Sequence, residues 1–169
     1  DSVVAPCTVA HLCGGCRLWR LPYDDGFATK AASIEGAVRR LAKDVDWPTP
    51  VRVAAPADRR LRERARLRPD PSGHLGFSRH RSDEIVAAAT CLALHERIDE
   101  VRVALAGVFD AAQVSYVMLE LDTRDDRVAV TVRAQDGVQP SLEAACRRVA
   151  QHRDVASVVV VTDDARTVI

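Results

Sequence analysis

The run Cys7-Thr8-Val9-Ala10-His11-Leu12-Cys13-Gly14-Gly15-Cys16 brings three of the chain's five cysteines together within ten residues. Thiolates are soft ligands, and this spacing lets one looping segment present three sulfurs to a single metal centre. Gly14 and Gly15 carry no side chains to crowd the centre, and glycine lets backbone N–H groups approach the sulfurs. In a reducing cytosol, a close group of cysteines binds metal more often than it forms disulfides. The run therefore predicts a metal-cluster site.

Three thiols leave one position of a four-ligand site open, and three other side chains are candidates for it. Cys146 falls on the apolar stripe of a predicted helix, where a free cysteine behaves as a small hydrophobic residue. Cys91 falls at a predicted strand-to-helix junction, where irregular backbone can aim a ligand. His11 with the three thiols would instead make a zinc site. We choose Cys91, and its distance along the chain means that the centre would also close a long loop.

Length and composition predict one domain spanning residues 1–169, and the strands and helices predicted below make its class α+β. The 169 residues are 47% apolar, which is enough for a real core. The 24 acidic and 24 basic residues cancel, so any electrostatic footprint must come from local segregation of charge. No apolar run approaches the roughly 20 residues that span a bilayer, and the N-terminus lacks the pattern of a signal peptide. We expect a cytoplasmic monomer with no membrane partner.

Apolar periodicity predicts three helices. The first runs from Phe27 to Val45 with Ile34, Val38 and Leu41 on one face, and prolines in Trp47-Pro48-Thr49-Pro50 stop it. The second runs from Glu96 to Val108, and the third begins near Pro140. Their inward residues are expected to be Ile98, Val101 and Leu105 in the second helix, and Leu142, Ala145, Cys146 and Val149 in the third.

Alternation of apolar and polar residues predicts the strands. An antiparallel meander is expected over 61–68, 75–79 and 84–87, with a turn at Asp70-Pro71-Ser72-Gly73. Further strands are expected over 114–121, 127–133 and 155–161, the last buried on both faces, and 166–169 could begin another. The expected architecture is an antiparallel sheet with helices packed mainly on one side.

The first meander strand carries a concentration of positive charge. Six arginines and one glutamate lie between Arg59 and Arg68, and alternation puts Arg62, Arg64, Arg66 and Arg68 on one strand face. Such a face suits RNA phosphates. The alternative is a solvated surface whose charges pair with acids such as Asp122, Asp125 and Asp126. Trp19, Tyr23 and Phe77 could stack on bases, although core packing is favoured for Phe77.

Several motifs occur in an order that resembles a known family. They are Cys7-x5-Cys13-Gly14-Gly15-Cys16, Leu21-Pro22-Tyr23, Lys30, Arg62-Glu63-Arg64-Ala65-Arg66-Leu67, Leu75-Gly76-Phe77, Arg79, Arg81, Ser82, Ile85-Val86 and Cys91-Leu92. From Cys7 to about Leu94 the chain is similar to the iron–sulfur central domain of the RNA uracil-5-methyltransferases, in the RumA-like branch that modifies 23S rRNA. The resemblance implies a [4Fe-4S] cluster held by Cys7, Cys13, Cys16 and Cys91. It also implies RNA, either rRNA or tRNA, near the arginines Arg62, Arg64, Arg66, Arg68, Arg79 and Arg81.

The family's catalytic parts have no counterpart in the sequence. A strand-to-helix Gly-x-Gly turn for S-adenosylmethionine is absent, and Cys146 lacks the motif expected around a nucleophilic cysteine. We therefore expect a cluster-bearing, RNA-contacting domain that is inactive alone, with S-adenosylmethionine bound by a catalytic domain outside this sequence. The second hypothesis is a stand-alone RNA-binding module linked by zinc, and the third is an electron-transfer protein.

Overall fold

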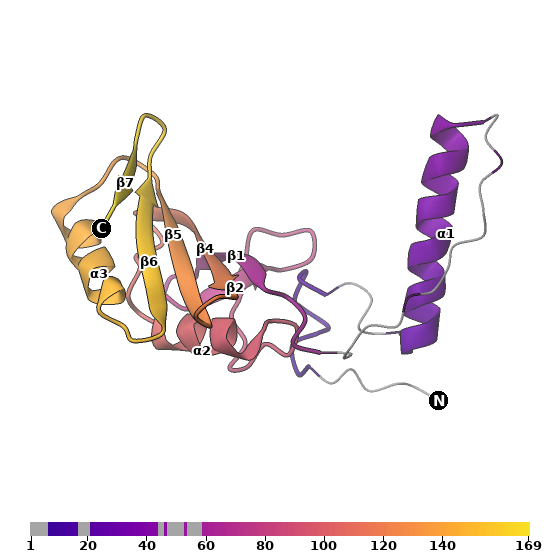
Figure 1. Ribbon diagram of the computed structural model, residues 1–169, viewed down its shortest axis with the longest axis horizontal. Coiled ribbons are helices and arrows are strands. Elements are labelled where there is room, and N and C mark those ends of the chain that lie inside the picture. The colour runs from indigo at the N-terminus through magenta and orange to yellow at the C-terminus, as the bar shows by residue number, and fades with distance from the viewer. Residues whose placement is uncertain (1–6, 17–20, 44–45, 47–52, 54–58) are drawn as a thin grey trace.

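The computed structural model of the chain describes residues 7–16, 21–43, 46, 53 and 59–169. Trp19 and the helix stop predicted at Trp47-Pro48-Thr49-Pro50 lie outside these residues. Within them the elements are one mixed sheet and three helices (Figure 1). The strands are β1 Arg64–Pro69, β2 Leu75–Ser78, β3 Ile85–Val86, β4 Val114–Asp122, β5 Arg127–Ala134, β6 Val155–Val161 and β7 Arg166–Val168. The helices are α1 Tyr23–Leu41, α2 Glu96–Ala104 and α3 Pro140–Ala150.

The order of strands in the sheet is β3-β2-β1-β4-β5-β6-β7. The predicted meander is confirmed, because β1, β2 and β3 are successive antiparallel neighbours. The expectation of a wholly antiparallel sheet is wrong in one place, since β5 and β6 are parallel. Parallel neighbours need a crossover connection, and α3 lies in the segment that joins them. The fold is therefore α+β with one parallel pair.

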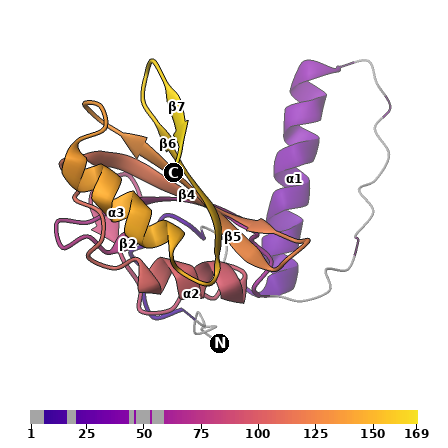
Figure 2. The same ribbon diagram turned by 60° about the vertical axis from the view of Figure 1, so that its left-hand side comes forward.

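One face of the sheet forms the core. Cross-strand registers align buried side chains in continuous rows, one of which is Leu67, Val117, Val132 and Val160. A second row is Ala65, Leu119, Val130 and Val158. Figure 2 shows α2 and α3 on the same side of the sheet, and their buried residues belong to the same core as these rows. Among the residues that the structure describes, no helix covers the other face, which carries the charged side of β1 and is called the open face below.

The apolar stripe of helix α2 is buried as predicted, but the helix ends earlier in the sequence than predicted. Ile98, Val101 and Leu105 are 0–2% exposed. The His95 side chain caps the helix by accepting the Arg97 N–H at 3.3 Å. The last helical residue is Ala104 rather than Val108, and Gly107 then adopts a φ of +74°, which a helix cannot contain.

Helix α1 differs from expectation in its start and its packing. It begins at Tyr23, four residues earlier than Phe27, after Pro22. Asp24 and Asp25 lie in its first turn, where carboxylates interact favourably with the helix dipole. Its predicted apolar face is not covered, because α1 stands apart from the sheet (Figure 1) and Ile34 is 57% exposed. None of the described helices is both long and apolar enough to cross a membrane.

Candidate metal centre and the adjoining arginine strand

The cysteine run is a series of tight turns attached to the end of β2. The Gly14 N–H donates to Ser78 O at 3.0 Å, and the His80 N–H donates to Leu12 O at 3.2 Å. Cys13 and Arg79 form an isolated antiparallel bridge between these hydrogen bonds. The meander thus fixes the backbone that carries the run.

Gly14 and Gly15 are required by their neighbours on β2. A Cβ at Gly14 would lie 2.8 Å from Ser78 O, and one at Gly15 would lie 3.1 Å from the Phe77 ring. The Gly15 N–H donates to Cys13 Sγ at 3.4 Å, the type of contact that the glycines were expected to allow. The space that a side chain would occupy is therefore filled by β2 itself.

Cys91 lies in the loop between β3 and α2, the strand-to-helix junction that was predicted. This loop is held by the residues that precede β1. The Arg60 N–H donates to Leu92 O at 2.9 Å, the Arg62 N–H donates to Ala93 O at 3.0 Å, and the His95 N–H donates to Arg62 O at 2.9 Å. Cys91 therefore has a fixed backbone position.

The ion pair between Asp99 and Arg102, which was not predicted from the sequence, is buried and holds the backbone of Cys91 through a hydrogen bond. Asp99 and Arg102 on α2 are 6% and 5% exposed, and Arg102 Nε donates to Asp99 Oδ1 at 2.8 Å. Asp99 Oδ2 accepts the Cys91 N–H at 3.0 Å and a 3.3 Å bond from Arg60 Nη1. Arg102 also donates to Leu75 O and Ala89 O, both at 3.2 Å. The sequence pattern that could have indicated this pair is an acid and a base three residues apart on one helix, each directly after a residue of the apolar stripe.

The four predicted ligands line one pocket. Cys7, Cys13, Cys16 and Cys91 share it with mostly apolar side chains, among them Leu75 and Phe77. Cys146 is fully buried in the core instead, and His11 is exposed and does not line the pocket. With the side chains where they stand, no group of three or more histidine, cysteine, aspartate or glutamate residues in the described part of the chain is arranged to hold a metal ion.

The environment of the thiols favours their protonated form over free thiolates. Burial raises the pKa of Cys13 and of Cys16, and the other cysteines of the pocket raise it further. The Gly15 N–H opposes this pKa rise at Cys13, and the Arg62 guanidinium opposes it at both residues. Crowded, partly buried thiols keep their protons at neutral pH unless a bound cation replaces them.

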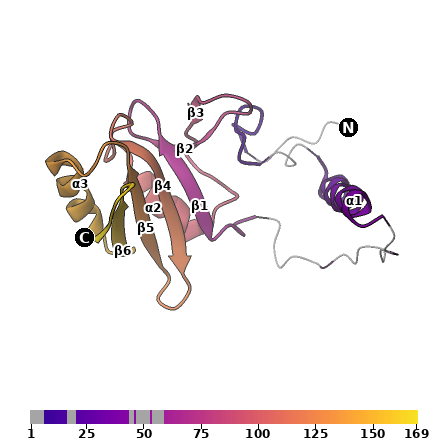
Figure 3. The ribbon, with the colours of Figure 1, turned by 90° about the horizontal axis from the view of Figure 1, so that it is seen from above.

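The predicted alternation is confirmed from Arg64 to Arg68, but β1 begins at Arg64 rather than Leu61, and Leu61, expected on the buried face, is 49% exposed. Arg64, Arg66 and Arg68 are exposed on the open face, and Ala65 and Leu67 are buried in the core. Arg62 lies just before the strand, where its Nη2 donates to Gly15 O at 3.1 Å and its guanidinium lies 5.4 Å from the Phe77 ring centroid. Figure 3 shows β1 beside β4, with β5 as the next strand of the sheet.

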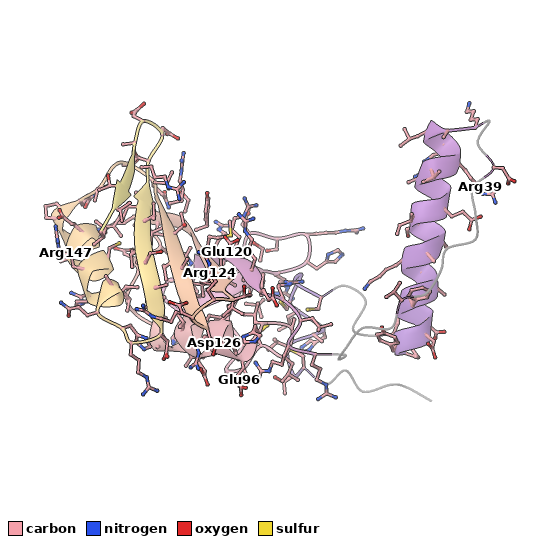
Figure 4. The ribbon with its side chains drawn as sticks, in the orientation of Figure 1. Arg39, Glu96, Glu120, Arg124, Asp126 and Arg147 are labelled. Carbon is pink, nitrogen blue, oxygen red and sulfur yellow. The ribbon has the colours of Figure 1, made fainter. Side chains whose placement is uncertain are left out.

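Local acids neutralise part of this charge, but they are not the predicted ones. Arg64 lies 3.6 Å from Glu120, Arg68 lies 3.2 Å from Asp83, and Arg79 lies 2.7 Å from Glu84. The acids expected to compensate pair elsewhere, with Asp122 near Arg124, Asp125 near Arg127, and Asp126 near Arg97. Arg124 and Asp126, labelled in Figure 4, lie in the turn between β4 and β5. Arg81 is exposed in the turn after β2, with a φ of +58°.

Comparisons with known proteins give a consistent class of relatives. An uncharacterised RNA methyltransferase of Halalkalibacterium halodurans is 30% identical over 107 residues, which is 60% of this chain and 23% of the relative. The 23S rRNA (uracil(1939)-C(5))-methyltransferase RlmD of Pseudomonas aeruginosa is 35% identical over 94 residues, 53% of this chain and 21% of the relative. The chain thus spans less than a quarter of the length of these relatives. No family model matches the sequence.

Solved structures are similar as well. One of them is the tRNA (uracil-54, C5)-methyltransferase of Pyrococcus abyssi in complex with S-adenosyl-L-homocysteine. The match has a TM-score of 0.49 at 18% identity, and it covers 93% of this chain and 38% of the other.

Proposed function

We propose that this chain is the cluster-bearing, RNA-contacting domain of an S-adenosylmethionine-dependent RNA uracil-5-methyltransferase. The observation that carries the proposal is the convergence of four cysteines, from two distant segments, on one pocket beside an arginine strand. Relatives named RNA methyltransferases match somewhat more than half of the chain. Because they are between four and five times as long as the matched region, we place S-adenosylmethionine binding and methyl transfer outside these residues.

Cys7, Cys13, Cys16 and Cys91 would hold a [4Fe-4S] cluster. Their donor set fits, since four thiols facing a mostly apolar pocket suit iron. Bound there, the cluster supplies iron–thiolate bonds that join the two segments. Arg62, with its guanidinium near Cys13 and Cys16, offsets the negative charge of thiolates. Asp99 holds the backbone of Cys91.

Anaerobic reconstitution with iron and sulfide tests the metal centre. The expected product is brown protein with four irons and four sulfides per chain, and Cys91→Ala should lose iron and visible absorbance. Cys146→Ala is the matched control, because that thiol lies in the core and should not affect the iron content. A colourless product with one zinc, or full iron loading of Cys91→Ala, would contradict the proposal.

RNA binding is tested by charge reversal on the open face. Arg64→Glu should weaken binding to rRNA fragments and lower the slope of log affinity against log salt by about one to two, because one phosphate contact becomes a repulsion. Arg147→Glu makes the same change on α3, away from β1, and should leave the slope unchanged (Figure 4). Equal effects of the two variants would show that the arginine strand is ordinary surface.

A further inference from the structure

A hollow lies on the open face of the sheet beside the cysteine pocket. It has room for about 430 Å³, within the range of ordinary small-ligand sites. Side chains from three strands line it, together with the turn that joins Cys13 to Cys16. The lining residues are Gly14, Gly15, Arg66, Arg68, Gly76, Phe77, Ser78, Ser115 and Tyr116.

The lining combines positive charge, aromatic rings and hydroxyl groups without an acid. Arg66 is exposed, lies 5.3 Å from the Tyr116 ring centroid, and has no carboxylate within ion-pair distance in the described part of the chain. Arg68 pairs with Asp83, whose side chain is fully exposed. Because an exposed ion pair contributes little, a phosphate can replace Asp83 at small cost.

The hollow and the cysteine pocket share a wall. Gly76 and Phe77 line both cavities. The Gly14–Gly15 turn borders the hollow on one side and is hydrogen-bonded to Cys13 Sγ on the other. The position of the hollow's floor therefore depends on how firmly the cysteine run is held.

We infer that this hollow binds one nucleotide of single-stranded RNA and that filling the cysteine pocket strengthens its binding. Arg66 and Arg68 take the phosphate, and the base lies against Tyr116 and Phe77. An unstacked base is accessible only in loops or single strands, which excludes a duplex as the ligand. The inference rests on the proposed function, and it adds Tyr116, Ser78 and Ser115 to the arginines expected from the sequence.

Binding of a labelled single-stranded oligouridine to the cluster-loaded protein tests the site. Tyr116→Leu removes the ring but keeps an apolar side chain, and it should weaken binding roughly 5- to 100-fold, as expected for the loss of one stacked base. Arg66→Gln should weaken it and lower the salt slope by about one. Arg147→Gln on α3 is the matched control and should bind as the unaltered protein does. Unaltered affinity of both Tyr116→Leu and Arg66→Gln would overturn the inference.

Crosslinking locates the nucleotide without relying on affinity. Ultraviolet irradiation of a 4-thiouridine-containing oligonucleotide should attach it to Phe77 or Tyr116, as read by mass spectrometry of the digested protein. Crosslinks confined to α1 or α3 would contradict the assignment. A DNA oligonucleotide that binds and crosslinks equally well would contradict RNA as the ligand.

The shared wall makes a separate prediction about the cluster. Protein stripped of iron, and the Cys91→Ala variant, should bind the oligonucleotide several-fold more weakly than the loaded protein. Equal affinity of loaded and stripped protein would overturn this coupling. The two proposals fail in different ways. If the cluster proposal is wrong, reconstitution leaves the protein without iron. If the nucleotide site is wrong, no crosslinks form at Phe77 and Tyr116.

Discussion

Asp99 is the residue on which the placement of Cys91 depends most. Its carboxylate is buried, neutralises Arg102, and accepts the backbone N–H of Cys91. Asp99→Asn keeps the shape but leaves Arg102 as a buried, uncompensated charge, which costs roughly 3–5 kcal/mol in comparable pairs. We expect a loss of that order in the free energy of unfolding measured in urea, together with faster loss of iron.

The control for Asp99 is an exposed pair of the same type. Glu143 and Arg147 on α3 are 45% and 65% exposed at 2.6 Å, so Glu143→Gln should change stability by less than about 1 kcal/mol. If Asp99→Asn were as mild as Glu143→Gln, the buried pair would have no role in placing Cys91.

Cys146 gives the protein a pH dependence that can be isolated. Burial raises its pKa to about 11 from 9.0, and Glu143 adds to the rise. The unfolded chain releases this proton at lower pH than the folded chain does. The stabilisation from the protonated thiol is therefore complete below pH 9 and is lost as pH rises toward about 11, by about 3 kcal/mol in total.

Cys146→Ala should remove this part of the pH dependence. Urea unfolding of both proteins from pH 8 to 11 should show a steeper fall in stability for the unaltered chain. The thiol should also resist alkylation at pH 8 until the protein unfolds. Parallel stability curves for the two proteins would show that Cys146 does not titrate differently in the folded and unfolded states.

At the scale of elements, two glycines with different surroundings predict opposite outcomes. Gly14→Ala forces a methyl group within 2.8 Å of Ser78 O, and overpacking of this kind costs about 1–3 kcal/mol. Gly36 lies inside α1, where an added Cβ meets only the flexible end of Arg40 at 3.6 Å. Gly36→Ala should favour the helix by roughly 0.4–1 kcal/mol.

Unfolding followed by far-ultraviolet circular dichroism measures both glycine variants. Iron retention adds a second measurement for Gly14→Ala, which should lose iron faster because the turn between Cys13 and Cys16 must shift. If Gly14→Ala retained stability and iron, the contact between the cysteine run and β2 would be looser than the 3.0 Å hydrogen bond from Gly14 to Ser78 indicates.

Local patterns predicted most elements because they depend on nearest neighbours in sequence. The alternation from Arg64 to Arg68 and the stripes of α2 and α3 follow from side-chain periodicity, and the structure confirms them. The parallel pairing of β5 with β6 was missed, because pairing direction depends on where a crossover helix packs. The uncovered face of α1 was missed for the same reason, since periodicity shows that a face is apolar but not what covers it.

The candidate site likewise has some residues that local sequence patterns predict and others that only the tertiary structure reveals. Thiol spacing identified Cys7, Cys13 and Cys16, and the resemblance supported Cys91, which lines the same pocket. Tyr116 and the pair Asp99–Arg102 come from elements outside the motifs. Their place at the site follows from the register of β4 beside β1 and from the docking of α2, which no spacing along the chain reveals.

Across the whole molecule, the cysteine pocket is where distant parts of the chain meet. The run 7–16 touches β2, and the loop 91–95 touches residues 60–62, so a bound cluster would restrain all four segments at once. Helix α3 and strand β6 lie at the other end of the sheet, with α3 packed on β6 (Figure 1). Loading of iron should therefore slow amide hydrogen exchange in 7–16 and 91–95 by at least tenfold. Exchange in α3 and β6 should change little, because local opening of these elements does not disturb the cysteine pocket. Mass spectrometry of loaded and stripped protein measures both regions together, and uniform slowing in both would mean that the cluster stabilises the fold globally and does not act as a local link.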